Sequence, residues 1–184
     1  QAVEAVKSRG KKVFLDLKFH DIPNTVAGAI KSVSELGANV MNIHCSGGME
    51  MMQKARQTAD ECGGLAVIGV TVLTSLDDEN LKDLGYAHTT EGQVLLFARQ
   101  AEEAGLDGIV CSPKEIEIIR AEVGEDFLLI TPGIRPAWAA KGDQKRITTP
   151  KDALDKGASA LVIGRPITAA DDPVEAMKRI IAEC

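Results

Sequence analysis

Short runs of strand-forming residues alternate with amphipathic segments along the whole chain. Strict alternation of strand and helix predicts a parallel sheet in an α/β protein. The near-continuous apolar character of runs such as ALVIG is typical of parallel strands that are covered on both faces. The expected strands span residues 13–18, 40–45, 66–73, 108–112, 128–132 and 160–164.

The segments between these runs have the features of helices. Residues 23–36 place Val26, Ile30 and Val33 on one stripe, as a helix packed on a sheet requires. Ser112 and Thr149 each precede a proline, which is the pattern of a helix cap followed by the first helical residue. The expected helices span residues 1–9, 23–36, 49–59, 91–104, 113–122, 150–156 and 173–182.

This repeat fits either a doubly wound sheet or a (β/α)8 barrel. A whole barrel usually takes about 250 residues, and this chain has 184. Residues 1–9 also read as the back half of a helix that leads into a buried strand. We therefore expect one domain over residues 1–184, with about six strands and with roughly two βα units missing at its N-terminal side.

Composition excludes several classes of protein. The formal net charge is −6 and the basic residues do not cluster, so nucleic acid is a poor candidate partner. The sequence contains no run of 18 apolar residues, so we expect no membrane span, and its start shows no signal-peptide pattern. Four scattered cysteines without metal-type spacing predict reduced thiols in a cytoplasmic protein and no metal site.

The stretch FLDLKFHDIPNT carries the first candidate site. Side chains alternate along a strand, so Asp16 and Lys18 should point to the same side. Both lie at the carboxyl end of the strand, where parallel α/β proteins place their active sites. Asp21 follows in the turn before a helix. The alternatives are a structural ion pair between Asp16 and Lys18 and a helix N-cap at Asp21.

A second group of residues suits a small anion. The last expected strand ends in Gly164 and Arg165, and the preceding one ends in TPGIRP, which contributes Arg135. Glycine lets the backbone approach a ligand closely, and guanidinium groups bind phosphate well. The alternative is a pair of surface arginines after ordinary turns. The long polar segment 135–150 is interpreted as a lid in which Gln144 contacts the phosphate, and Trp138 is a contact or a packing anchor.

Hydroxyl and imidazole groups follow two other strands. The run GVTVLTS offers Thr74 or Ser75 as a hydrogen-bond donor to a ligand, although either hydroxyl could instead cap the next helix. His44 ends the run VMNIH and faces the same end of the sheet. We interpret it as a structural histidine.

Taken in order, DLKFHDIPNT, VTVLTS, TPGIRP, GDQ and VIGRPI resemble the bacterial form of the orotidine 5′-monophosphate decarboxylase family. The matches extend over nearly the whole chain. The resemblance implies a (β/α)8 TIM barrel that acts as a homodimer and converts orotidine 5′-monophosphate to uridine 5′-monophosphate without a cofactor, in pyrimidine biosynthesis. In the family, an Asp and a Lys from the first two strands complete the site, and neither strand is recognised in this chain.

The resemblance also implies roles for individual residues. Lys18 would donate the proton, Asp16 would belong to the same charged array, and Asp21 would reach the partner subunit's site. The remaining positions would bind the nucleotide: Thr25, Thr74, Arg135, Gln144, Gly164 and Arg165.

The chemistry agrees with these roles. Loss of carbon dioxide from a pyrimidine leaves a poorly stabilised carbanion, and a preformed ammonium can stabilise that charge and then protonate it. Two alternatives stay open. One is a magnesium-dependent decarboxylase or aldolase acting on a keto-sugar phosphate, which would share Asp16, Lys18 and Asp21. The other is an inactive nucleotide-binding fragment.

Overall fold

A computed structural model describes residues 1–139 and 148–184 of the chain. The six strands of these described residues belong to one sheet, and their order in the sheet is their order in the sequence, β1 to β6. Parallel pairing is seen for β1 with β2, β2 with β3, and β5 with β6. This consecutive order is that of a βα barrel, whereas doubly wound sheets reverse their strand order at a switch point.

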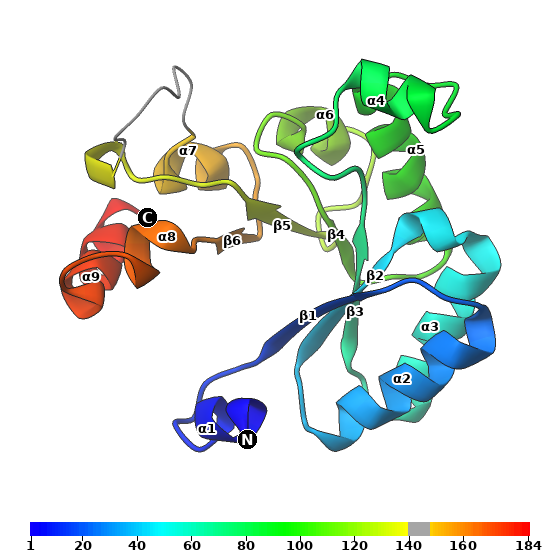
Figure 1. Ribbon diagram of the computed structural model, residues 1–184, viewed down its shortest axis with the longest axis horizontal. Helices are drawn as coiled ribbons and strands as arrows, with labels where there is room; N and C mark the ends of the chain where they lie inside the picture. The colour runs from blue at the N-terminus through cyan, green and yellow to red at the C-terminus, as the bar shows by residue number, and fades with distance from the viewer. Residues whose placement is uncertain (140–147) are drawn as a thin grey trace. The chain divides into compact units, whose positions relative to one another are not determined.

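The described residues form two compact units, Gln1–Ile109 and Val110–Cys184, and strand β4 (Gly108–Val110) contains the boundary. In the first unit, helices α2 and α3 lie side by side along the strands (Figure 1). Its elements are α1 (Ala2–Lys7), β1 (Phe14–Phe19), α2 (Pro23–Glu35), β2 (Val40–His44), the 3-10 helix η1 (Cys45–Gly47), α3 (Met49–Glu61), β3 (Ala66–Val70), α4 (Asp78–Asp83) and α5 (Thr90–Glu103).

The core of the first unit confirms the helical periodicity expected from the sequence. Val26, Ile30 and Val33 of α2 are at most 3% exposed. Helix α2 contacts α3 and β1, and Met51 and Met52 of α3 are buried as well. Burial of such side chains stabilises a fold by about 1.5–3 kcal/mol each.

The second unit is smaller, and the part of it that the structure describes contains β5, β6 and four α-helices. Helix α8 contacts α9, and α7 contacts both α9 and β6. Its elements are α6 (Ile116–Arg120), β5 (Leu128–Pro132), the 3-10 helix η2 (Ala137–Ala139), α7 (Pro150–Asp155), β6 (Ala160–Val162), α8 (Arg165–Thr168) and α9 (Pro173–Glu183). Among the described residues, no helix is long and apolar enough to cross a membrane.

Several local expectations were wrong. The helix after Ser112 begins at Ile116 and not at Pro113, since Ser112 and Glu115 form a hydrogen-bonded turn first. Helix α4 was not expected from the sequence; a reciprocal capping box between Asp77 and Asn80 begins it. The short helix α8 was also missed.

Burial on both faces holds for β2, β3 and β5 but not for every strand. Asp16, Leu17 and Lys18 of β1 are exposed, and so are Ala160 and Val162 of β6. Both strands lie at the ends of the sheet order, where each has a single neighbouring strand. The apolar sequence pattern reports on the composition of a strand and not on its position in the sheet.

Candidate active site

Asp16 and Lys18 lie together on β1, as the sequence predicts. The Lys18 Nζ atom is 2.5 Å from Asp16 Oδ1, and both side chains are about half exposed. The pair therefore has solvent access and room for a ligand. The ion pair by itself adds little stability, because exposed pairs contribute about 0–1 kcal/mol.

The backbone brings these two side chains together in a way that simple alternation does not describe. Lys18 has φ of 51°, and it is the one non-glycine residue with positive φ among the described residues. The register of β1 against β2 shifts between Leu15 and Phe19. A left-handed conformation costs a residue with a Cβ about 1–2 kcal/mol and persists only where neighbours enforce it.

Asn42 is the neighbour that contacts this irregular segment. Its side chain is on β2, and the residue is 1% exposed. Asn42 Oδ1 accepts a hydrogen bond from the Lys18 backbone N–H at 2.8 Å, and Nδ2 donates one to Asp16 Oδ1 at 2.6 Å. No motif in the sequence pointed to Asn42 as a site residue. The signal was a single amide inside the apolar run VMNIH, since a buried polar side chain needs hydrogen-bond partners.

The electrostatics keep Asp16 ionised. Partial burial raises its pKa, but hydrogen bonds from Lys18 and Asn42, together with the positive charge of Lys18, outweigh this effect and leave the pKa lowered. His44 lies nearby on β2, with its ring 5.5 Å from that of His20. Its pKa is lowered by burial and by the charges of His20 and Lys18, so the neutral imidazole is favoured.

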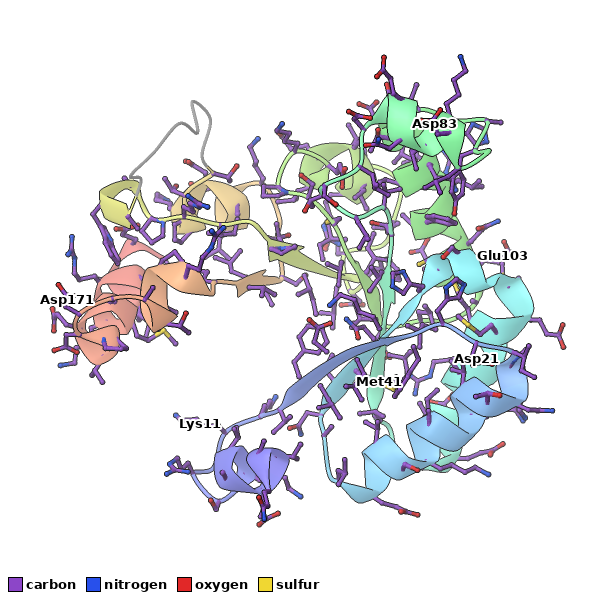
Figure 2. The ribbon with its side chains drawn as sticks, in the orientation of Figure 1. Lys11, Asp21, Met41, Asp83, Glu103 and Asp171 are labelled. Carbon is purple, nitrogen blue, oxygen red and sulfur yellow. The ribbon has the colours of Figure 1, made fainter. Side chains whose placement is uncertain are left out.

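Asp21 lies where β1 gives way to α2, and Figure 2 labels it there. Its Oδ1 accepts a hydrogen bond from the Ile22 N–H at 2.7 Å, but it does not cap α2, whose N-cap is Ile22. The N-cap alternative for Asp21 is therefore wrong. Asp21 and Thr25 are exposed, and Ile22 is 68% exposed. These exposed residues are available to a ligand or another chain.

Thr74 and Ser75 follow β3 in a turn and are exposed. The strand ends at Val70, earlier than expected, and Asp77 caps the next helix. The capping alternative for these hydroxyls is therefore wrong as well.

The second unit holds the expected arginines around one cavity of about 500 Å³. Arg135, Arg165 and Arg179 line it, and Asp171, labelled between α8 and α9 in Figure 2, lines it as well. Within the described residues, no ion pair joins these arginines to a carboxylate. Such a cavity is suited to an anion.

Arg179 is a further residue that the sequence did not reveal. Its Cζ atom lies 4.2 Å from the centroid of the Trp138 ring, so Trp138 serves as a packing surface for a guanidinium group. Arg179 belongs to an ordinary amphipathic helix, α9, and no motif marks it. Gly164 comes directly before α8, and a Cβ built on it would meet no atom within 4 Å, which leaves open space at its backbone. Gln144 lies outside the described residues.

The strand order and the paired acid and amine at the end of β1 define a parallel α/β protein of the barrel class. A family model described as Orotidine 5'-phosphate decarboxylase / HUMPS family matches residues 1–180. The chain belongs to this family.

Individual relatives agree. The chain is 52% identical to a protein of Moorella thermoacetica named orotidine 5'-phosphate decarboxylase, over 99% of this chain and 75% of that protein. It is 50% identical to the protein of the same name from Alkalilimnicola ehrlichii, over 100% of this chain and 78% of that one. The crystal structure of orotidine 5'-phosphate decarboxylase from Lactobacillus acidophilus superposes with a TM-score of 0.87 at 38% identity, covering 98% of this chain and 79% of that one.

Proposed function

We propose that this chain decarboxylates orotidine 5′-monophosphate to uridine 5′-monophosphate, as a cytoplasmic enzyme of pyrimidine biosynthesis. The observation that carries the proposal is the contact of Lys18 Nζ with Asp16 Oδ1 at the end of β1, in a chain about half identical to proteins of that name. The four cysteines are free thiols, as is usual in a reducing compartment.

In the proposed reaction, the bond between the pyrimidine ring and its carboxylate breaks, and the electron pair stays on the ring carbon. The Lys18 ammonium stabilises this carbanion and transfers a proton to it, which forms the new C–H bond and releases carbon dioxide. The neutral amine then regains a proton from water. Asp16 holds the Lys18 ammonium in place before the transfer, through the contact of its Oδ1 with Nζ.

The other residues are proposed to bind the nucleotide. Thr74 contacts the pyrimidine, while Arg135, Gln144, Gly164 and Arg165 hold the phosphate. The cavity lined by Arg135, Arg165 and Arg179, for which the described residues show no ion pair with a carboxylate, supports the phosphate role and adds Arg179 to it. Binding energy from the phosphate, which does not react, can be used to stabilise the transition state.

We further propose that the active form is a homodimer in which Asp21 and Thr25 act in the partner subunit's site. The exposure of Asp21 beside the exposed apolar Ile22 supports this role. Mixing the inactive variants Lys18→Ala and Asp21→Ala tests it. A mixed dimer would have one site with both Lys18 and the partner's Asp21, so about a quarter of all sites should recover activity. Absence of recovery, with dimers of both variants present, would contradict the shared site.

The assay for the proposed function follows the loss of orotidine 5′-monophosphate absorbance. It should be run on this chain and on a longer form that includes any residues that the gene encodes before Gln1. Turnover by either form that Lys18→Ala abolishes supports the proposal. If neither form turns over the nucleotide but uridine 5′-monophosphate still binds, the chain is a nucleotide-binding protein instead.

The description of the family model names HUMPS beside orotidine 5'-phosphate decarboxylase. A chelator should therefore be included in the assay, to test the magnesium-dependent alternative. The magnesium-dependent alternative predicts loss of activity in EDTA and turnover of a keto-sugar phosphate. The proposed reaction predicts the same rate with and without EDTA.

A further inference from the structure

In the irregular segment of β1, the Lys18 backbone N–H and the Asp16 carboxylate both form hydrogen bonds with the side chain of Asn42. Leu15 pairs with Met41 and Phe19 pairs with Ile43, so three residues of β1 lie opposite Asn42 alone. The normal ladder is interrupted there, and the Lys18 N–H needs another acceptor. The amide of Asn42 is that acceptor, at 2.8 Å.

The same amide also holds the acid of the site. Asn42 Nδ2 donates to Asp16 Oδ1, the oxygen that also accepts from the Lys18 ammonium. The contacts therefore form a closed ring, from the Lys18 backbone through Asn42 to Asp16 and back to the Lys18 side chain. Asn42 is buried between neighbouring strands, whereas Asp16 and Lys18 are exposed. It is the rigid member of the ring.

We propose that Asn42 is a positioning residue for the reaction, which holds Lys18 in its left-handed backbone conformation and fixes the Asp16 carboxylate beside the ammonium. The inference rests on the proposed function for its catalytic part. A proton donor has to be held to within about 0.5 Å of its working position, and a misplacement of about 1 Å costs roughly 100-fold in rate. The half-exposed side chains of Lys18 and Asp16 cannot maintain such precision alone.

Only asparagine or a close analogue can do both tasks at once. The carbonyl oxygen accepts from a backbone N–H, and the NH₂ group donates to a carboxylate. Aspartate at this position would keep the acceptor but lose the donor at neutral pH. Alanine would lose both. Comparing these two substitutions therefore separates the effect of the hydrogen bond to the Lys18 backbone from that of the hydrogen bond to the Asp16 carboxylate.

The chain provides a matched control at the other end of the same pair of strands. Asn39 Oδ1 accepts a hydrogen bond from the Val13 backbone N–H, also at 2.8 Å. The bond is of the same type and joins the start of β2 to the residue before β1, but it involves no residue of the site. Asn39→Ala therefore reports the effect of losing such a bond without an effect on chemistry.

The first measurement is amide hydrogen exchange by NMR, which does not depend on activity. Asn42→Ala should speed exchange of the Lys18 amide by about 10-fold or more and leave the Val13 amide unchanged, and Asn39→Ala should do the reverse. Asn42→Asp should leave the Lys18 amide protected. An unchanged Lys18 amide in folded Asn42→Ala would overturn the proposal, whatever the enzyme's activity.

The second measurement is steady-state kinetics on the form of the protein that turns over the nucleotide. Asn42→Ala and Asn42→Asp should lower kcat by about 100-fold with KM within about threefold, because the phosphate contacts are unaffected. Asn39→Ala should stay within about twofold of wild type. If folded Asn42→Ala keeps the wild-type kcat, or if Asn42→Ala and Asn39→Ala lower kcat by the same small factor, Asn42 is structural only.

A double-mutant test separates positioning from a general loss of stability. If Asn42 acts through Asp16, then Asn42→Ala should cost much less in the Asp16→Ala background than in the wild type. Equal losses in the two backgrounds would contradict the proposal. An inactive wild type would count against the proposed function, while the exchange measurement would still decide the geometric part.

Discussion

The positive φ of Lys18 leads to a prediction about stability that has the opposite sign to the usual one for glycine. Both Lys18→Ala and Lys18→Gly remove the ammonium and its exposed ion pair, so that loss cancels between them. The variants differ only in whether a Cβ occupies a left-handed position. We expect Lys18→Gly to be the more stable variant.

The magnitude follows from two opposing contributions. A Cβ at φ of 51° costs about 1–2 kcal/mol, which glycine relieves. Glycine also gives the unfolded chain more freedom, which costs about 0.4–1 kcal/mol relative to alanine. The net gain is about 1 kcal/mol in favour of Lys18→Gly, or a rise in Tm of roughly 2–4 °C for a chain of this length.

Leu17 provides the control for this comparison. It is the adjacent residue, its side chain is 51% exposed, and its φ is not positive. Leu17→Gly should therefore be less stable than Leu17→Ala by about 0.5–1 kcal/mol, the ordinary penalty for glycine in a strand. The two pairs of variants should differ in opposite directions.

Urea unfolding monitored by circular dichroism gives the four free energies of unfolding. Activity should fall at least 1000-fold in both Lys18 variants, since a general acid typically contributes 100- to 10,000-fold and its charge contributes further. The reasoning would be refuted if Lys18→Gly were less stable than Lys18→Ala by the ordinary penalty. In that case Lys18 is not held in a strained conformation in solution.

Two further predictions concern the anion cavity and the histidine beside the site. Arg179→Ala should weaken binding of uridine 5′-monophosphate about 10-fold and leave binding of uridine unchanged, as measured by calorimetry. The neighbouring Lys178→Ala should change neither affinity. Equal weakening for nucleotide and nucleoside would exclude a phosphate contact. Because the pKa of His44 is lowered in the folded protein, this imidazole takes up a proton at a higher pH in the unfolded chain, so the free energy of unfolding should fall as pH drops below 6.5. His44→Asn should reduce this pH dependence in urea titrations at several pH values. The same pH dependence in the variant would show that other groups are responsible.

Much of the fold could be read from the sequence because the relevant interactions are local. The stripe of Val26, Ile30 and Val33 predicts a helix with one buried face, and the structure confirms it. Strand β5 was predicted with its observed bounds, and Thr149 caps α7 as its motif indicates. The errors occurred at element ends, where a turn such as the one at Ser112 competes with the first turn of a helix.

Some residues of the candidate site could likewise be predicted from the sequence, and others could not. The types of residue that carry the chemistry, Asp16 and Lys18 at a strand end and arginines after two others, were visible as motifs. Their assigned roles remain predictions for the assays above. Asn42 and Arg179 could not be assigned from the chain alone, because each acquires its significance from a residue distant in sequence.

The sequence by itself determined the alternation of strands and helices, the apolar faces that pack them, and the family to which its motifs point, since all of these depend on spacing within a few residues. Only the tertiary structure decided that β1 departs from regular geometry at Lys18 and that a buried amide on the next strand meets both the backbone and the acid there. The physical reason is that a left-handed lysine is unfavourable on its own. It becomes possible only where a partner from another strand supplies the hydrogen bond that the interrupted ladder lacks.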